Sequence, residues 1–247
     1  MVQAQVQSTA DGAIIFDAGL GIAPTPAWFD RSHWQPHGAA AAGRGGVAFV
    51  DTPAGECALR HYHRGGLAAK VSTDAYLWAG AARTRAFREF RLLADLHDRG
   101  LPVSPPVAAR YRCRGLAYRA DLLTRRVRGD TLAELLAQDR LDASLAARIG
   151  STIARFHAAG VWHADLNAHN ILAAADGVIT LIDFDRGRLR APRLAWQQAN
   201  LQRLLRSLRK LGAQRIGDFD VRFRHPLLAA YHDAMALRAQ DAPPESR

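Results

Sequence analysis

Residues Val161–Gly187 read VWHADLNAHNILAAADGVITLIDFDRG, and the interpretation of the whole chain starts from this stretch. It places Asp165, Asn170 and Asp183 at successive spacings of five and thirteen positions, with apolar runs beside them. Two carboxylates and an amide in this order suit a phosphate-bound magnesium ion and an attacking hydroxyl, because ATP-dependent phosphoryl transfer depends mainly on positioning and charge stabilisation. The stretch therefore indicates a kinase that uses ATP and Mg²⁺.

Each polar residue of the stretch has a predicted role. Asp165 is expected to orient the acceptor hydroxyl and to accept its proton as the oxygen attacks the γ-phosphorus. Asn170 and Asp183 are expected to bind magnesium, with water and phosphate oxygens completing the octahedron. His163 is expected to support the loop through hydrogen bonds. Turns or caps would explain any one of these residues alone, but the complete spacing favours the kinase.

The length and composition of the chain limit which kinds of protein it can be. The 247 residues are enough for one large domain or two lobes, and no apolar run approaches the roughly 18 to 20 residues of a spanning helix. The N-terminus lacks the basic and apolar regions of a secretory signal. Cys57 and Cys113 fit no metal-ligand spacing, which favours a reduced, cytosolic protein. We expect a protein that is soluble or attached only to the surface of a membrane.

The chain is strongly basic, with a formal net charge of +10 that comes almost entirely from arginine. Such a balance favours an anionic partner: nucleic acid, anionic lipid, or a substrate that carries phosphate or carboxylate. Nucleic-acid binding would explain the charge but not the motif, and no basic stretch is interleaved with aromatic residues. The prediction is therefore an anionic partner other than nucleic acid.

The pattern of the chain predicts an α+β protein with two lobes around a cleft. Residues 1–127 are expected to form a strand-rich N-terminal lobe, and residues 128–247 a mainly helical C-terminal lobe that carries the motif. The N-terminal lobe is predicted as an irregular arm over about 1–30, a glycine loop, an antiparallel sheet with strands over 47–50, 56–62, 107–112 and 116–127, and one helix over 84–99. The C-terminal lobe is predicted to have helices over 132–138, capped by Asp130 or Thr131, over about 143–158, capped by Asp142, and over 194–211.

The motif resembles the catalytic and metal-binding loops of the protein-kinase-like fold, with Asp183-Phe184-Asp185 in the place of the usual Asp-Phe-Gly. Ala164 stands where the usual loop has arginine, so control by phosphorylation of an activation loop is not expected. With LRHYHRGGL (59–67) and TRAFREFRLLADLHDRGLPVSPPVAAR (84–110), the chain resembles 3-deoxy-D-manno-octulosonic acid (Kdo) kinases over roughly 43–190. The resemblance implies a two-lobed protein-kinase-like fold.

The resemblance also implies a nucleotide site in the N-terminal half. Gly43, Gly45 and Gly46 would cover the ATP phosphates, where missing side chains let backbone N–H groups approach. Arg60 would pair with the α/β-phosphates in the place of the usual lysine, although arginine and lysine are not interchangeable. Strand alternation puts Ala58 on the same face, which suits a small residue under adenine.

Two points of this nucleotide site stay open. Lys70 is a second candidate for the phosphates, less well placed because two glycines separate it from the strand. Glu89 of the predicted helix would orient Arg60, or else form only a surface pair with Arg85, four positions earlier.

For function, the resemblance implies phosphorylation of the Kdo 4-hydroxyl of Kdo-lipid IVA in lipopolysaccharide core biosynthesis. Such a lipid-linked substrate suggests a peripheral protein on the cytoplasmic side of the bacterial inner membrane. Cations near the motifs would suit an anionic sugar on a phosphorylated lipid. These are His61, His63, Arg64, Arg186, Arg188 and Arg190.

Other functions stay possible at this point. An aminoglycoside-type phosphotransferase shares the motif layout, but its cationic substrates call for an acidic cleft. A small protein kinase would need a peptide-binding lobe for which the chain is short. A pseudokinase that binds nucleotide without catalysis is favoured by Arg60 in the lysine position and opposed by the intact motif.

Overall fold

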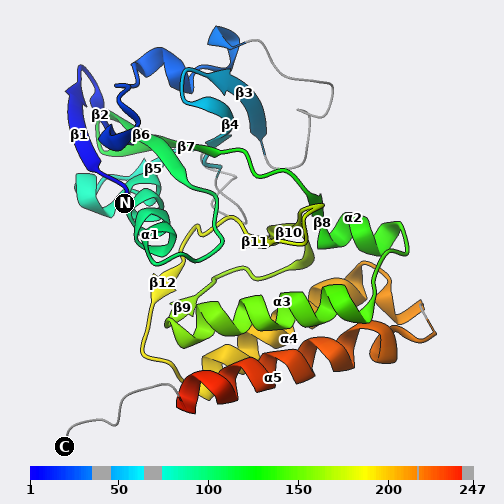
Figure 1. The fold of residues 1–247 in the computed structure, drawn as a ribbon. Helices are drawn as coiled ribbons and strands as arrows, with labels where there is room; N and C mark the ends of the chain where they lie inside the picture. The colour runs from blue at the N-terminus through cyan, green and yellow to red at the C-terminus, as the bar shows by residue number, and fades with distance from the viewer. Residues whose placement is uncertain (35–45, 64–73, 216, 241–247) are drawn as a thin grey trace, which may run out of the picture. The chain divides into compact units, whose positions relative to one another are not determined.

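The computed structural model describes residues 1–34, 46–63, 74–215 and 217–240 (Figure 1). The chain forms two compact units, Met1–Val127 and Arg128–Arg247. The first is built on an antiparallel sheet and the second mainly on helices, which confirms the α+β class. That the units form kinase-like lobes around a cleft stays a prediction. Within the described residues, no helix is both long enough and apolar enough to cross a bilayer.

The described part of the first unit contains a seven-stranded sheet with the strand order β1-β2-β6-β7-β4-β3, and β5 pairs with β7 (Figure 1). Helix α1 (Arg85–Asp98) packs against β6 and β7. The predicted strands and helix beyond residue 46 agree closely with the observed ones. The strands are β1 (Ala4–Thr9), β2 (Gly12–Asp17), β3 (Val47–Thr52), β4 (Gly55–His61), β5 (Tyr76–Leu77), β6 (Pro106–Arg114) and β7 (Ala117–Arg125).

The prediction of an irregular arm over about residues 1–30 is wrong. β1 and β2 form an antiparallel hairpin at the edge of the sheet, and short 3₁₀ turns follow it. The side chains of β1 (AQVQST) are mostly exposed, so this strand shows no apolar periodicity. β2 is buried over Ala13–Phe16, directly after the Asp11-Gly12 pair. The hairpin turn is Ala10-Asp11, and Asp11-Gly12 ahead of an apolar run was the available sequence signal for it.

Alternation along β4 sets which of its residues enter the core. Cys57 and Leu59 are buried in the apolar cluster of the first unit, together with residues of β2, β3 and the Pro26–Phe29 turn. Ala58 and Arg60 are only partly buried and lie on the opposite face, as strand geometry requires. The shared face predicted for Ala58 and Arg60 is therefore present.

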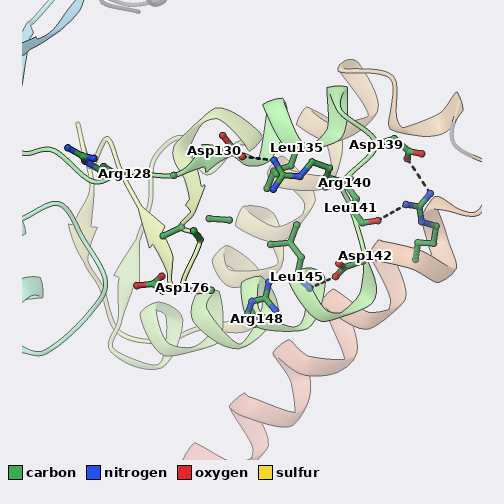
Figure 2. A pocket seen from close by; sticks show the side chains of 16 residues that line it. Arg128, Asp130, Leu135, Asp139, Arg140, Leu141, Asp142, Leu145, Arg148 and Asp176 are labelled. Carbon is green, nitrogen blue, oxygen red and sulfur yellow. Dashed lines mark hydrogen bonds and ion pairs between the residues drawn. The ribbon is translucent and has the colours of Figure 1, made fainter. Parts of the chain in front are cut away.

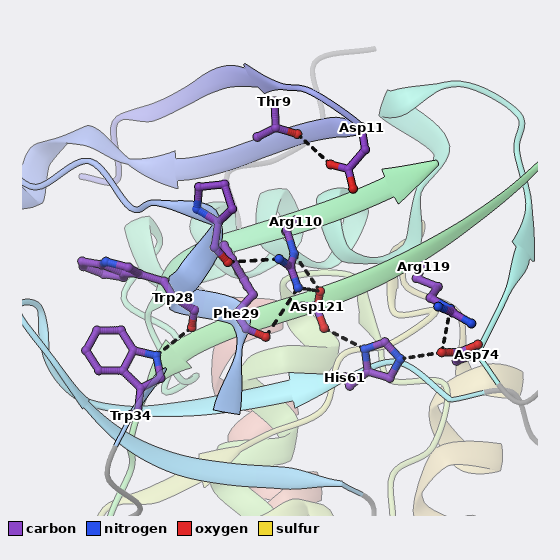
Figure 3. A network of polar contacts seen from close by, with 11 residues as sticks. Thr9, Asp11, Trp28, Phe29, Trp34, His61, Asp74, Arg110, Arg119 and Asp121 are labelled. Atoms are coloured by element: carbon purple, nitrogen blue, oxygen red, sulfur yellow. Dashed lines mark hydrogen bonds and ion pairs between the residues drawn. The ribbon is translucent and has the colours of Figure 1, made fainter. Parts of the chain in front are cut away.

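A buried ion pair joins β6 to β7 (Figure 3). Arg110 and Asp121 lie directly opposite each other, and the Nε and Nη2 groups of Arg110 donate to Oδ2 of Asp121 at 3.0 and 2.8 Å. Arg110 also donates to carbonyl groups of the Pro26–Phe29 turn, which fastens this turn to the sheet. Oδ1 of Asp121 lies 2.7 Å from Nδ1 of His61, whose Nε2 lies 3.2 Å from Asp74.

The second unit is mainly helical, and α5 is the helix that sequence reasoning missed. Its apolar residues do not gather on one stripe, so it lacks the periodic signal. A π-helical turn, Asp220–Arg224, leads into it. The helices are α2 (Leu132–Ala137), α3 (Ala143–Ala158), α4 (Leu194–Lys210) and α5 (His225–Gln240), and the short strands are β8 (Asp130–Thr131), β9 (Val161–Trp162), β10 (Ile171–Ala173), β11 (Ile179–Leu181) and β12 (Arg188–Leu189).

Local sequence signals begin the helices of the second unit. Thr131, rather than Asp130, caps α2, and it forms a reciprocal capping box with Glu134. Asp142 caps α3, as predicted. Gly150 of α3 permits close packing against α5, because a Cβ atom at this position would lie 2.2 Å from the carbonyl oxygen of Leu227.

Replacing Asp121 with alanine should destabilise the first unit by about 3 to 5 kcal/mol, because the charge of the buried Arg110 guanidinium would lose its carboxylate partner. The measurement is the free energy of unfolding from urea melts. Asp74→Ala removes a carboxylate from the more exposed end of the same network and should cost less than about 1 kcal/mol. An equal loss of unfolding free energy in Asp121→Ala and Asp74→Ala would contradict the prediction that the buried end of the network contributes more.

Candidate active site

Strands β10 and β11 bring the two predicted magnesium ligands to the same end of a hairpin. Ile171 lies opposite Leu181 in this antiparallel pair. Asn170 therefore falls just before one strand, and Asp183 falls just after the other. The Ile182 N–H donates to the Asn170 carbonyl oxygen at 3.1 Å, which extends the ladder by one more bond. The register explains how residues thirteen positions apart come to the same edge.

The amide of Asn170 is oriented by the loop that carries the predicted base. Its Nδ2 group donates to the Asp165 carbonyl oxygen at 2.9 Å, and the residue is 8% exposed. This hydrogen bond fixes which side of the amide presents its oxygen, a donor that suits magnesium. In the described part of the chain, no group of three or more His, Cys, Asp or Glu side chains could hold a metal ion. The Asn170 amide oxygen and the Asp183 carboxylate are hard oxygen donors, which suit magnesium when phosphate and water supply its other ligands.

Asp183 lies in a turn with an uncommon backbone conformation. Its φ is 61°, in the left-handed region that residues other than glycine rarely adopt. The next residue, Phe184, is fully buried and stacks on Phe156 of α3 with ring centroids 5.8 Å apart. The Gly187 N–H closes the turn on the Phe184 carbonyl oxygen at 2.7 Å. A buried ring thus holds an exposed carboxylate in a strained position, which is a common feature of functional sites.

His163 is a buried imidazole that connects the base loop to this hairpin. Its Nδ1 accepts a hydrogen bond from the Asp165 N–H at 3.2 Å, and its Nε2 lies 3.0 Å from the Ile182 carbonyl oxygen. Nε2 therefore carries the proton. Burial lowers the pKa of His163, against the opposing effects of the Ile182 hydrogen bond and the carboxylates of Asp183 and Asp165. A neutral ring with both nitrogens engaged provides the loop support that was predicted for His163.

Helix α4 fastens the base loop at two further points. Oδ1 of Asn200, a residue 2% exposed, accepts from the His163 N–H at 3.3 Å, and its Nδ2 donates to the His163 carbonyl oxygen at 3.0 Å. Oγ of Ser207 accepts from the Ala168 N–H at 3.1 Å. Sequence reasoning missed both residues, because their polar row on the helix gave no indication of which distant segment it would contact.

The predicted base itself is accessible. The side chain of Asp165 is 62% exposed, and its Oδ2 accepts from Nδ2 of Asn167 at 3.0 Å. Its Oδ1 lies 3.6 Å from Nη1 of Arg203 on α4. The carboxylate is thus oriented from both sides while it stays open to an incoming hydroxyl.

Arg60 of β4 pairs with Glu89 of α1 in the first unit. Its Nη2 donates to Oε2 of Glu89 and, at 3.2 Å, to the hydroxyl of Tyr62, which donates in turn to the same Glu89 oxygen at 2.6 Å. The Glu89 side chain is 2% exposed, so it does not lie on the surface as the alternative pairing with Arg85 required. Burial and the Glu89 charge raise the pKa of Tyr62 well above its usual range. Tyr62 therefore acts as a neutral third member of the group, one that sequence reasoning missed.

The glycine loop is described only at its last residue. Gly46 has a φ of 78°, which favours glycine, and a Cβ atom there would lie 3.1 Å from Nε2 of His63. The nucleotide-binding roles of Gly46, Ala58, Arg60 and Glu89 stay predictions. The other predicted residues of this region, Gly43, Gly45, Arg64 and Lys70, lie outside the described residues.

A hollow of about 920 Å³ in the second unit lies away from the motif (Figure 2). It is lined by α2, the start of α3 and the β10–β11 turn, Ala173–Gly177, at the hairpin end opposite the predicted magnesium ligands. Figure 2 shows Arg140 facing Asp130, with 2.7 Å between them, and Arg222, which also lines the hollow, lies 3.2 Å from Asp139. This balance of charge gives no reason to assign an anionic ligand to the hollow.

Comparison with known proteins identifies a family. The model of the lipopolysaccharide kinase (Kdo/WaaP) family matches residues 32–224. A 3-deoxy-D-manno-octulosonic acid kinase of Stenotrophomonas maltophilia (strain K279a) is 49% identical over 211 residues, which cover 83% of each chain. Proteins of the same name from Xanthomonas campestris pv. campestris (strain B100) and Xanthomonas oryzae pv. oryzae (strain PXO99A) are 50% identical over 210 residues and 49% over 220, covering 83% and 84% of each chain. The region matched by the family model contains Arg60, Glu89, Asp165, Asn170 and Asp183.

Replacing Asn200 with alanine should destabilise the second unit by about 1 to 3 kcal/mol, because the backbone N–H and C=O of His163 would lose their partners in a buried setting. Urea unfolding measures this loss. Gln198→Ala, at an exposed position of the same helix, should stay within about 0.5 kcal/mol of the wild type. If Asn200→Ala unfolds like Gln198→Ala, the stability of the unit does not depend on the Asn200 contacts with His163.

Proposed function

The chain belongs to the lipopolysaccharide kinase (Kdo/WaaP) family, and from this premise we propose that it transfers the γ-phosphoryl group of ATP to the 4-hydroxyl of Kdo in Kdo-lipid IVA. Membership of this family makes it an enzyme that phosphorylates a sugar. The observation that carries the proposal is the arrangement around His163, which ties the loop of Asp165 to the hairpin end that presents Asn170 and Asp183.

In the proposed reaction, Asp165 acts as the base. The acceptor hydroxyl oxygen attacks the γ-phosphorus and gives its proton to the Asp165 carboxylate, while the bond from phosphorus to the β–γ bridging oxygen breaks and ADP leaves. Asn170 and Asp183 would hold magnesium, which neutralises charge on the phosphates when it is bound. The exposure of Asp165 supports this role, because the acceptor must reach its carboxylate.

The first unit is proposed to bind ATP in the manner of the protein-kinase-like fold. Arg60 would contact the α/β-phosphates, with Ala58 under adenine and the loop of Gly43, Gly45 and Gly46 over the phosphates. The buried contacts of Glu89 and Tyr62 support this role for Arg60, since a guanidinium held by charge-assisted hydrogen bonds is already positioned before a ligand arrives.

We place the protein at the cytoplasmic face of the bacterial inner membrane, because a lipid-linked acceptor must be met at a membrane surface. The segment 186–197 contains no aspartate or glutamate. Its exposed Leu189 and Leu194 stand among arginines, and the guanidinium of Arg190 lies 4.0 Å from the ring centroid of Trp162. Anionic headgroups attract such a segment by about 1 kcal/mol per arginine. The exposed arginines are Arg186, Arg188, Arg190 and Arg193.

Incubation of the protein with Kdo-lipid IVA, ATP and Mg²⁺ should add one phosphate to the acceptor, detected by mass spectrometry. Asp165→Asn should lower kcat by about 10² to 10⁴-fold, because it removes the base. Asp176→Asn changes an exposed aspartate of the β10–β11 turn and should leave kcat unchanged. A wild-type protein that binds ATP but adds no phosphate would overturn the proposed acceptor.

Replacing Arg60 with methionine should lower kcat/KM for ATP by on the order of 10²-fold, because a positioned cation at the phosphates is lost. Steady-state kinetics with varied ATP give this value. Arg88→Met removes an exposed arginine of α1 and serves as the matched control. A larger loss in Lys70→Met than in Arg60→Met would instead assign the phosphate contact to Lys70.

A further inference from the structure

We infer that Arg203 is a further catalytic residue, whose guanidinium binds the phosphoryl group during its transfer. The inference rests on the proposed function, since it concerns the same reaction. The starting observation is the ion pair between Arg203 and the predicted base, with 3.6 Å between Nη1 of Arg203 and Oδ1 of Asp165. Among the described residues, no other cation forms an ion pair with Asp165.

The position of Arg203 is set by contacts on both sides of it along α4. Three residues earlier, Asn200 holds the backbone of His163, and four residues later, Ser207 holds the backbone of Ala168. Helical spacing puts the three positions on one face. Helix α4 therefore runs beside the loop in the same chain direction. This alignment places Arg203 next to Asp165, between the contacts that Asn200 and Ser207 make. A solvated surface arginine would need no such alignment.

The loop does not itself supply a lysine or arginine that could contact the phosphoryl group. Residues 163–170, HADLNAHN, contain no lysine or arginine. Asn167, two positions after the base, is a neutral amide that donates to Asp165, and burial keeps His163 neutral. The phosphoryl group spreads negative charge over its three equatorial oxygens during transfer, and a planar guanidinium matches such oxygens with paired donors. Arg203 brings this group to the loop from α4.

The resting contact is loose enough to be exchanged for a substrate contact. A distance of 3.6 Å is longer than the roughly 2.7 to 2.9 Å of a charge-assisted hydrogen bond, and the Arg203 side chain is 47% exposed. When ATP and the acceptor are bound, Arg203 turns from Asp165 to the phosphoryl oxygens. The carboxylate is then available for the hydroxyl proton as the new O–P bond forms and the bond to ADP breaks. Arg203 takes no part in the proton transfer and only stabilises negative charge.

The test replaces Arg203 with methionine, which removes the charge and keeps much of the side-chain volume. We expect kcat to fall by about 10² to 10³-fold, with smaller changes in KM for ATP and for Kdo-lipid IVA and an unchanged unfolding midpoint. Arg203→Lys should recover part of the loss, and guanidinium ion should partly restore Arg203→Ala. Arg206→Met, an exposed arginine on the same helix, is the control and should match the wild type.

Hydrolysis of ATP in the absence of the acceptor, with water taking the place of the acceptor hydroxyl, would be measured as a second readout. A wild type that hydrolyses ATP without phosphorylating Kdo-lipid IVA would refute the proposed acceptor, and the Arg203 variants would still be judged on hydrolysis. Unchanged kcat and hydrolysis in Arg203→Met would overturn the inference and leave the proposed function standing. A loss accompanied by a lower unfolding midpoint and no rescue by guanidinium ion would assign Arg203 a structural role and also overturn it.

Discussion

Nδ1 of His163 accepts a hydrogen bond from the Asp165 N–H, and Nε2 donates one to the Ile182 carbonyl oxygen. The candidate active site depends on these two hydrogen bonds. A charged imidazole would donate from both nitrogens, so Nδ1 would face the N–H of Asp165 with no lone pair to accept it. Burial disfavours this state, because it lowers the pKa of His163 more than the nearby carboxylates raise it. Desolvation thus favours the neutral form of His163, and this form connects the loop of the predicted base to the predicted metal ligands.

The two units hold the cations that are proposed to be functional in different ways. Arg60 is fastened by a buried carboxylate and a buried tyrosine, so its guanidinium has little freedom to move. Arg203 contacts an exposed carboxylate across a longer distance, and exposed ion pairs of this kind are weak. A cation that only binds phosphates benefits from being positioned in advance, whereas one that must leave the base as the reaction starts has to be exchangeable. Arg60 is therefore more buried than Arg203, in agreement with the different roles proposed for the two arginines.

Sequence reasoning succeeded where the signal was local. The apolar runs beside the motif form β10 and β11, and the helices predicted over 84–99, about 143–158 and 194–211 are observed as α1, α3 and α4. It failed where the signal was absent or distant. β1 is an exposed edge strand without alternation, and α5 has no single apolar stripe. Asn200 and Ser207 meet a loop more than thirty positions earlier, and nothing in a single sequence connects the two.

This chain differs from the usual kinase motif in ways that are consistent with a site whose loops are held by hydrogen bonds and packing within the unit. Ala164 replaces an arginine that would otherwise respond to a phosphorylated segment. The loop is instead fastened by Asn200 and His163, neither of which needs a modification to form its bonds. The turn after Asp183 is closed by its own backbone, with Phe184 buried beneath it. The described contacts hold the predicted catalytic loop and metal turn through buried neutral groups, and these groups need no change of charge to form their bonds. These contacts give the physical reason to expect a site that is assembled without phosphorylation.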